Sequence, residues 1–329
     1  MSDNLPTVSI IIPCRNEEKF IGKCLGSVIE QDYPKENLEI LVVDGRSEDK
    51  TKEIVSEFSK KYLNIRLLEN PKKIVSAALN IGIRESRGAY ILRADAHSVY
   101  DENYISKSIE FLEKTGAACV GGPMRAVGDN YLGKAIAFIH HSRFGIGVAK
   151  FHNENTEGWA DTVYLGCYQK EIFDKIGLYN EKLTRTEDIE LNSRLRKIGG
   201  KIFLTPQIKS FYHCRPTLGG LFHQNFLNGF EVIRTAKEMF YAICFRHLVP
   251  LFFTGSLILS LIFSPFFLIA RTLFVLIFGA YLLVNLFFSI KISLKEGIQY
   301  LFILPLVFFI FHFSYGFGSI WGLVKLIKD

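Results

Sequence analysis

The chain has 329 residues, of which 39 are Lys or Arg and 33 are Asp or Glu, so its net charge of +6 is modest. The basic residues do not form a stripe with aromatic ones, which disfavours a nucleic-acid-binding protein and favours attraction to phosphates or anionic lipid headgroups. Six cysteines lack the paired spacing of a zinc or disulfide framework, as expected in a reducing compartment. The length predicts about two domains.

The amino-terminal half alternates short apolar runs with amphipathic segments. Strands are expected at 8–13, 38–43, 65–68 and 89–93, and helices at 16–31, 49–62 and 74–86. This alternation predicts a layered α/β domain with parallel strand pairing. A P-loop is absent, and no Gly-x-Gly-x-x-Gly follows the first strand, which argues against a kinase or a dinucleotide dehydrogenase.

Polar side chains follow three of these strands, where a parallel sheet binds its ligands. They are Arg15, Asn16 and Glu17 after the first strand, Asp44 to Ser47 after the second, and Asp95 and His97 after the fourth. A carboxylate and an imidazole two residues apart can both reach one divalent cation. The alternative is a turn in which Asp95 caps the next segment and His97 is only solvated.

The following segment is more irregular. A strand at 117–120 ends at Gly-Gly-Pro, and another is expected at 161–167. Between them, residues 131–148 form an amphipathic segment that rests either on a membrane surface or on the sheet. Glu187 and Asp188 precede a helix at 189–198 that Thr184 or Thr186 could cap. The acidic pair could therefore have only a structural role, in which its charge is stabilised by the helix dipole. A strand at 202–204 follows.

Beyond residue 245 the chain is almost continuously apolar. Uncharged stretches at 248–270, 273–290 and 300–324 each approach or exceed the roughly 18–20 residues that cross a hydrocarbon core. Pro250, Pro265 and Pro305 are expected inside these spans, where membrane bundles tolerate them. The first two spans could instead form a re-entrant hairpin. We therefore predict a globular domain at 1–236 and a membrane domain at 237–329.

Basic residues predict the orientation of these spans. Arg234, Lys237 and Arg246 precede the first span, and Lys291 and Lys295 lie between the second and third. Both groups of basic residues lie on the same side of the membrane if the first two spans form a hairpin. The positive-inside rule then predicts a multi-pass membrane protein whose globular domain is in the cytoplasm. The polar amino terminus predicts no secretory signal.

Six motifs in order, and a seventh in the last span, resemble family-2 glycosyltransferases with the GT-A fold, most of all the membrane-bound succinoglycan-type glucosyltransferases. They are Val8–Glu18, Val43–Asp49, Arg93–His97, Tyr164–Tyr168, Glu187–Leu191, Tyr212–Pro216 and Ser314–Gly318. The resemblance implies a mixed Rossmann-like sheet sandwiched by helices, followed by about three transmembrane helices.

The resemblance also implies roles for individual residues. The nucleotide-sugar donor, expected to be UDP-linked, would contact Pro13, Arg15, Glu17, Asp44, Ser47, Asn80, Arg93 and Asp95. Asp95 and His97 would hold Mn²⁺ or Mg²⁺, with His213 as a further ligand; imidazole favours manganese. Asp188 would be the base that activates the acceptor, and the acceptor side would include Gly166, Glu187, Arg215 and Gln224.

One departure from the family concerns processivity. Processive relatives carry Gln-x-x-Arg-Trp near the first span, whereas this chain has Leu227 and Asn228 at the Arg and aromatic positions. We therefore expect single-sugar addition and not processive synthesis. With this, the resemblance implies an inverting enzyme that adds the glucose of UDP-glucose to a polyprenyl-linked saccharide acceptor in exopolysaccharide or cell-surface glycan synthesis. The alternatives are a polyprenyl-phosphate sugar synthase and a non-catalytic membrane subunit of a glycan export complex.

Overall fold

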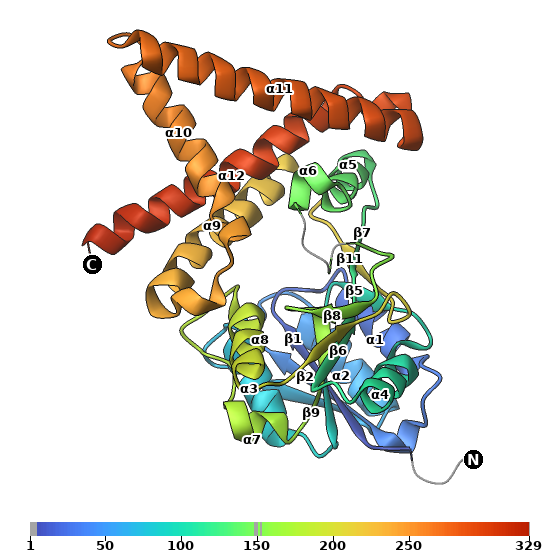
Figure 1. Ribbon diagram of the computed structural model, residues 1–329. Coiled ribbons are helices and arrows are strands. Elements are labelled where there is room, and N and C mark those ends of the chain that lie inside the picture. The colour runs from blue at the N-terminus through green and yellow to red at the C-terminus, as the bar shows by residue number, and fades with distance from the viewer. Residues whose placement is uncertain (1–4, 148–150, 152, 329) are drawn as a thin grey trace. The chain divides into compact units, whose positions relative to one another are not determined.

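The computed structural model describes residues 5–147, 151 and 153–328, whose contacts divide the chain into two units (Figure 1). We call them the sheet unit, Met1–Arg125 with Lys150–Tyr212, and the helical unit, Ala126–Ala149 with His213–Asp329. This division differs from the predicted boundary at residue 236. It lies earlier because the helix that precedes the apolar spans packs with them, and because an insertion from the first half joins the helical unit.

The sheet unit is built on an eight-stranded sheet in the order β3-β2-β1-β4-β9-β6-β10-β8. Its parallel part comprises β3 (Ile65–Glu69), β2 (Leu38–Asp44), β1 (Val8–Cys14) and β4 (Tyr90–Arg93). Next, β9 (Tyr164–Gln169) runs antiparallel to both β4 and β6 (Cys119–Gly122). Last, β10 (Ile202–Leu204) is parallel to β6, and β8 (Gly158–Ala160) is the antiparallel edge.

Helices cover both faces of this sheet, so β1 is buried along its whole length. Successive β1 side chains point to opposite faces: Ile10 and Ile12 join one core cluster and Ile11 the other. The first cluster includes residues of α1 (Ile21–Ile29), α2 (Thr51–Lys61) and α4 (Tyr104–Thr115). The second includes residues of α3 (Val75–Glu85), α7 (Ile172–Ile176) and α8 (Glu187–Lys197). A small sheet has the order β5 (Ser98–Tyr100), β11 (Ser210–His213), β7 (Met124–Val127).

The helical unit contains α5 (Tyr131–His140), α6 (Arg143–Ile146), α9 (Leu218–Glu238), α10 (Val249–Phe263), α11 (Leu268–Glu296) and α12 (Ile303–Lys328). Three segments are long and apolar enough to cross a membrane, as predicted: Phe245–Phe263, Leu268–Glu296 and Ile303–Ile327.

The position of the first break between these helices corrects the prediction. The expected first span, 248–270, continued through Pro265, whereas α10 ends at Phe263 and α11 begins at Leu268. Proline lacks the amide hydrogen and clashes with the preceding turn, so the chain turns here and not between residues 270 and 273, where the first two predicted spans meet. Pro250 and Pro305 lie in the first turns of α10 and α12, where that hydrogen has no helical partner.

Two contacts explain why residues outside the spans belong to the helical unit. Helix α9 lies against α12 so closely that a Cβ on Gly229 would be 2.0 Å from the Tyr315 carbonyl oxygen. The Phe144 ring of α6 packs 5.0 Å from the ring of Phe308 and 4.7 Å from that of His312, both in α12. The described part of the amphipathic segment predicted at 131–148 therefore packs on the apolar helices; Val148 itself lies outside the described residues.

Candidate active site

The loops that follow β1 and β2 interlock through bonds between side chains and backbone. The Asn16 amide donates to Ser47 Oγ (2.9 Å), and the Glu48 amide donates back to Asn16 Oδ1 (2.9 Å). The Glu17 amide donates to Thr51 Oγ1 (2.8 Å). Asn16 has a φ of +55°, a left-handed conformation that asparagine tolerates better than most residues. The two loops thus form one rigid edge of the sheet.

Asp44 ends β2 beneath these loops, with its side chain only 1% exposed. Its carboxylate accepts from the Ser47 amide (3.0 Å) and from Ser47 Oγ (2.5 Å), and Lys52 Nζ lies 3.5 Å away. The structure therefore brings Asp44 and Ser47 together. Pro13, within β1, and Arg15, just after it, lie on the neighbouring strand and loop.

Asn80 has a different setting from the other predicted donor residues. Its amide nitrogen donates to the Tyr179 carbonyl and to Glu181 Oε1 (both 2.9 Å), and its Oδ1 accepts from the Tyr179 amide (2.8 Å). This buried side chain holds the loop before α8 onto α3, so its observed contacts are structural.

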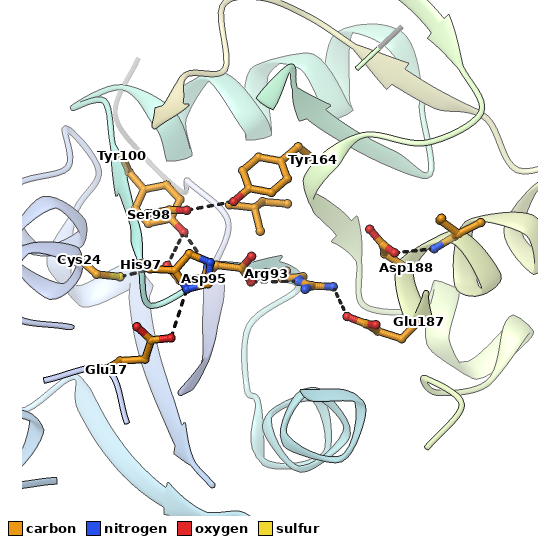
Figure 2. Close-up of polar contacts among 12 residues, drawn as sticks. Glu17, Cys24, Arg93, Asp95, His97, Ser98, Tyr100, Tyr164, Glu187 and Asp188 are labelled. Carbon is orange, nitrogen blue, oxygen red and sulfur yellow. Dashed lines mark hydrogen bonds and ion pairs between the residues drawn. The ribbon is translucent and has the colours of Figure 1, made fainter. Parts of the chain in front are cut away.

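The Asp95 backbone is fixed by a tyrosine that the sequence did not single out. Tyr100 Oη accepts from the Asp95 amide (2.7 Å) and donates to the Asp95 carbonyl (3.2 Å), and Cys24 Sγ donates to the same carbonyl (3.6 Å) (Figure 2). The only sequence signal was the position of Tyr100 in a short run after the motif. Such a frame holds the Asp95 side chain in place without using its carboxylate.

His97 is oriented from two sides. Its Nδ1 lies 3.3 Å from Glu17 Oε1, and its ring packs edge-on against Tyr212 of β11 at 5.4 Å between centroids. A carboxylate that orients an imidazole is the usual outer-shell arrangement of a metal-binding histidine. With the hard oxygen donor of Asp95 beside it, the donor set fits a cation such as Mn²⁺.

Such a site would be open to a ligand. Among the described residues, no group of three or more His, Cys, Asp or Glu side chains could hold a metal ion. His213, the predicted further ligand, belongs to the helical unit and lies 3.2 Å from Asp129 there. Any cation held by Asp95 and His97 would therefore need further ligands, such as water or oxygen atoms of a bound substrate.

Arg93 connects the end of β4 to the start of α8. Its Nε lies 3.3 Å from Asp95 Oδ1, and its Nη1 lies 3.0 Å from Glu187 Oε1, although Arg93 and Glu187 are 94 positions apart in sequence (Figure 2). Both side chains are largely buried, at 14% and 4% exposed. The sequence had assigned Arg93 to the donor alone and Glu187 to the acceptor side. In the structure, this ion pair joins the Asp95 motif to the acidic pair.

Asp188 follows Glu187 in the first turn of α8. Its Oδ1 accepts from the Ile189 amide (2.8 Å), whereas Thr186, at the N-cap, makes no side-chain capping bond. Burial raises the pKa of Asp188 above its ordinary value, and the positive charge of Arg93 opposes that rise. Burial likewise raises the pKa of Glu187, again opposed by Arg93. A carboxylate with a raised pKa is a stronger base once it is ionised.

The predicted acceptor-side residues are divided between the two units, with Gly166 and Glu187 in the sheet unit. Gly166 is in β9, where a Cβ would be 2.7 Å from Cys119 Sγ, so close packing inside the sheet already requires glycine. The preceding Leu165 has a φ of +51°, a strained conformation for a bulky residue. Arg215 and Gln224 belong to the helical unit.

Comparison with known proteins decides the family. Residues 9–177, more than half of the chain, match the family model described as glycosyl transferase family 2. This chain is a family 2 glycosyltransferase. The match covers nearly all of β1, all of β2 to β4, and the Asp44, Asp95 and His97 motifs, so the parallel part of the enzyme's sheet lies within the family domain.

Curated relatives agree with the predicted resemblance. The enzyme is 30% identical over 97% of both chains to a Methanococcus voltae protein named dolichyl N-acetyl-alpha-D-glucosaminyl phosphate 3-beta-D-2,3-diacetamido-2,3-dideoxy-beta-D-glucuronosyltransferase. It is 34% identical to the succinoglycan biosynthesis protein ExoA of Rhizobium meliloti, over 68% of this chain and 69% of that one. The predicted likeness to succinoglycan-type enzymes is confirmed.

Solved structures confirm the GT-A fold. A Pyrobaculum calidifontis mannosyltransferase, solved in complex with GDP-Man and Mn²⁺, superposes with a TM-score of 0.64 over 96% of this chain and 87% of its own, at 18% identity. Residues 1–349 of S. aureus TarS, in complex with UDP, give a TM-score of 0.52 over 98% and 92% of the two chains, at 17% identity.

Proposed function

We propose that this glycosyltransferase moves one sugar, glucose from UDP-glucose, onto a lipid-linked saccharide with inversion at the anomeric carbon. The observation that carries the proposal is the Arg93 bridge, because it brings the predicted donor motif and the predicted base motif into one site. The printed name of the Methanococcus voltae relative describes a dolichyl-linked sugar phosphate as its acceptor, and ExoA takes part in succinoglycan synthesis. Both support a lipid-linked acceptor in cell-surface glycan or exopolysaccharide synthesis.

The donor would lie along the polar edge of β2, β1 and β4. The buried Asp44 carboxylate, held by Ser47, would accept hydrogen bonds from the base or ribose. Asp95 and His97 would hold a divalent cation, which when bound neutralises the charge of the departing diphosphate. Glu17 keeps the His97 ring oriented for that task.

Asp188 would act as the general base. Its carboxylate takes the proton of the acceptor hydroxyl as that oxygen forms a bond to the anomeric carbon, while the bond from this carbon to the diphosphate oxygen breaks on the opposite face. Burial suits Asp188 to this role, because a raised pKa increases its affinity for the proton that it takes.

The apolar helices would place this chemistry at a membrane. Three segments long and apolar enough to span a bilayer would confine the enzyme to the surface that carries a lipid-linked acceptor, raising the effective concentration of both reactants. The basic residues Arg234, Lys237, Arg246, Lys291 and Lys295 favour a cytoplasmic sheet unit.

The deciding experiment is the substitution Asp188→Asn. We expect a normally folded protein that still binds the donor, but whose transfer to a lipid-linked saccharide falls by about 10²–10⁴-fold because the proton acceptor is lost. Radiolabelled sugar transfer and mass spectrometry of the lipid product measure this, with a single added hexose expected. Asp174→Asn, at an exposed position of α7, is the matched control and should keep full activity.

Three results would contradict the proposal. Near-normal turnover of Asp188→Asn would remove this residue from the mechanism. If that turnover used a lipid phosphate as the acceptor, it would favour the polyprenyl-phosphate sugar synthase, because a phosphate needs little help from a base. A long homopolymer made by the wild-type enzyme would disprove single-sugar addition.

A further inference from the structure

Glu187 carries a buried carboxylate that the protein satisfies on one side only. Its side chain is 4% exposed, and Oε1 is paired with Arg93 Nη1 at 3.0 Å. Its other oxygen, Oε2, is buried and has no hydrogen-bond partner within the described part of the chain. Buried polar atoms are rarely left unpaired, because the group loses its water without a replacement, and the cost is greatest for a charge.

Glu190, one turn further along α8, shows what a purely structural carboxylate looks like here. Its side chain is 1% exposed, and both of its oxygens are held by Arg194, at 2.5 Å from Nε and 2.8 Å from Nη2. The same helix therefore pairs both oxygens of one glutamate and, within the described part of the chain, leaves one oxygen of the other unpaired.

The position of Glu187 indicates which molecule uses that acceptor. Arg93, which fixes Glu187 Oε1, also lies 3.3 Å from Asp95 Oδ1 in the donor motif. A carboxylate oxygen repels phosphate and accepts hydrogen bonds from hydroxyl groups, which a sugar supplies in quantity. The remaining oxygen of Glu187 is thus suited to the sugar of the donor and not to its diphosphate.

We propose that Glu187 Oε2 accepts a hydrogen bond from a hydroxyl group of the donor's sugar, and that Arg93 is the positioning residue that aims it. This inference rests on the proposed function and deepens it, because it names a residue that selects the sugar. A donor without that hydroxyl would leave the buried oxygen unpaired and bind less well.

The test compares binding of the nucleotide with binding of the nucleotide sugar. Calorimetry on the full chain in detergent with Mn²⁺ would use UDP, UDP-glucose, UDP-galactose, UDP-N-acetylglucosamine, GDP and GDP-mannose, and would continue with the best-bound sugar donor and its nucleotide. We expect Glu187→Gln to weaken binding of the nucleotide sugar by about tenfold, because a charged hydrogen bond is replaced by a neutral one. The affinity for the nucleotide alone should not change. Glu190→Gln, the matched buried glutamate, should change the affinity of neither.

A second measurement identifies the hydroxyl. Among 2-, 3-, 4- and 6-deoxy analogues of the donor's sugar, one should bind the wild type about tenfold more weakly than the parent, yet bind Glu187→Gln as well as the parent does. Equal losses for nucleotide and nucleotide sugar in Glu187→Gln, or no loss for either, would overturn the inference while leaving the glycosyltransferase reaction intact. If the wild type bound none of the nucleotide sugars, the proposed function would fail first and the inference with it.

Discussion

Asp95 and His97, the proposed cation ligands, are held in place by their neighbours. Tyr100 and Cys24 hold the Asp95 backbone, and Glu17 lies 3.3 Å from the His97 ring nitrogen Nδ1. Because Glu17 fixes one ring nitrogen, the other can face a cation. Removing such an outer-shell partner typically lowers metal affinity by about 10–100-fold.

Metal removal is therefore the residue-scale prediction. We expect a chelator to abolish sugar transfer and Mn²⁺ to restore it, and we expect Glu17→Gln to need about 10–100-fold more Mn²⁺ for half-maximal rate. Nucleotide release measured against free Mn²⁺ gives both values. Glu18→Gln, an exposed neighbour in the same loop, should behave as wild type. Full turnover in the chelator would remove the cation from the mechanism.

The sequence could predict these site residues only as far as local signals reach. Asp44 ends β2, and Asp95 and His97 follow β4 within four residues, so the rule for parallel sheets predicts that they lie at one edge of the sheet. The Arg93–Glu187 pair gave no such signal, because a contact across 94 positions depends on how α8 packs beside β4. Asn80 was assigned to the donor from the resemblance. Its three hydrogen bonds to Tyr179 and Glu181 could not be predicted from the helical pattern around it, because they depend on a loop about 100 positions further along the chain.

At the scale of elements, α9 and α12 show how glycine permits close packing. A Cβ on Gly318 of α12 would lie 1.9 Å from the Phe226 carbonyl oxygen of α9, and Ser319 Oγ donates to the Gly229 carbonyl at 3.2 Å. Small residues of this kind let two helix backbones approach in an apolar environment. This explains why glycine stands at position 229 of α9 and at position 318 of the Ser314–Gly318 motif.

The substitution Gly318→Val tests this packing. We expect it to separate α9 from α12 and to lower the thermal stability of the detergent-solubilised protein by several degrees, since overpacking costs about 1–3 kcal/mol. Gly279→Val in α11, where a Cβ would meet nothing within 4 Å, is the matched control and should melt like wild type. Equal melting temperatures for the two variants would show that α9 does not need this contact.

Element prediction succeeded where the apolar pattern was long. The four parallel strands were located within one residue at each end, and the three long apolar helices were found with ends displaced by up to seven residues, because each has a continuous run of buried or lipid-compatible side chains. The short strands β5, β7, β8 and β11 were not predicted, since three or four residues carry no periodicity. The break at Pro265 was misplaced because the spans were bounded by the absence of charge, and Pro265 was expected inside the first of them.

At the scale of the whole molecule, the two units are interleaved in sequence. The segment Ala126–Ala149 is inserted between strands of the sheet unit, yet its contacts belong to the helical unit. Ile136 and Ile139 of α5 are almost completely buried, and α5 packs on α12. Hydrophobicity along the chain predicted an amphipathic segment but not its partner, because two apolar surfaces, the sheet and the spans, were available to it.

This interleaving predicts how the enzyme responds to truncation. A variant ending at Pro216, before α9, keeps the sheet unit and the inserted segment but loses the helices that cover Ile136, Ile139 and Phe144. We expect it to aggregate without detergent, because a contiguous apolar surface becomes exposed. Replacing residues 126–149 with a glycine–serine linker in the same truncated chain should restore a monodisperse protein by removing that surface. Light scattering and gel filtration compare the two. If the first variant were already monodisperse, the inserted segment would have to cover its apolar side chains within the sheet unit, and the insertion would not depend on the membrane helices for burial.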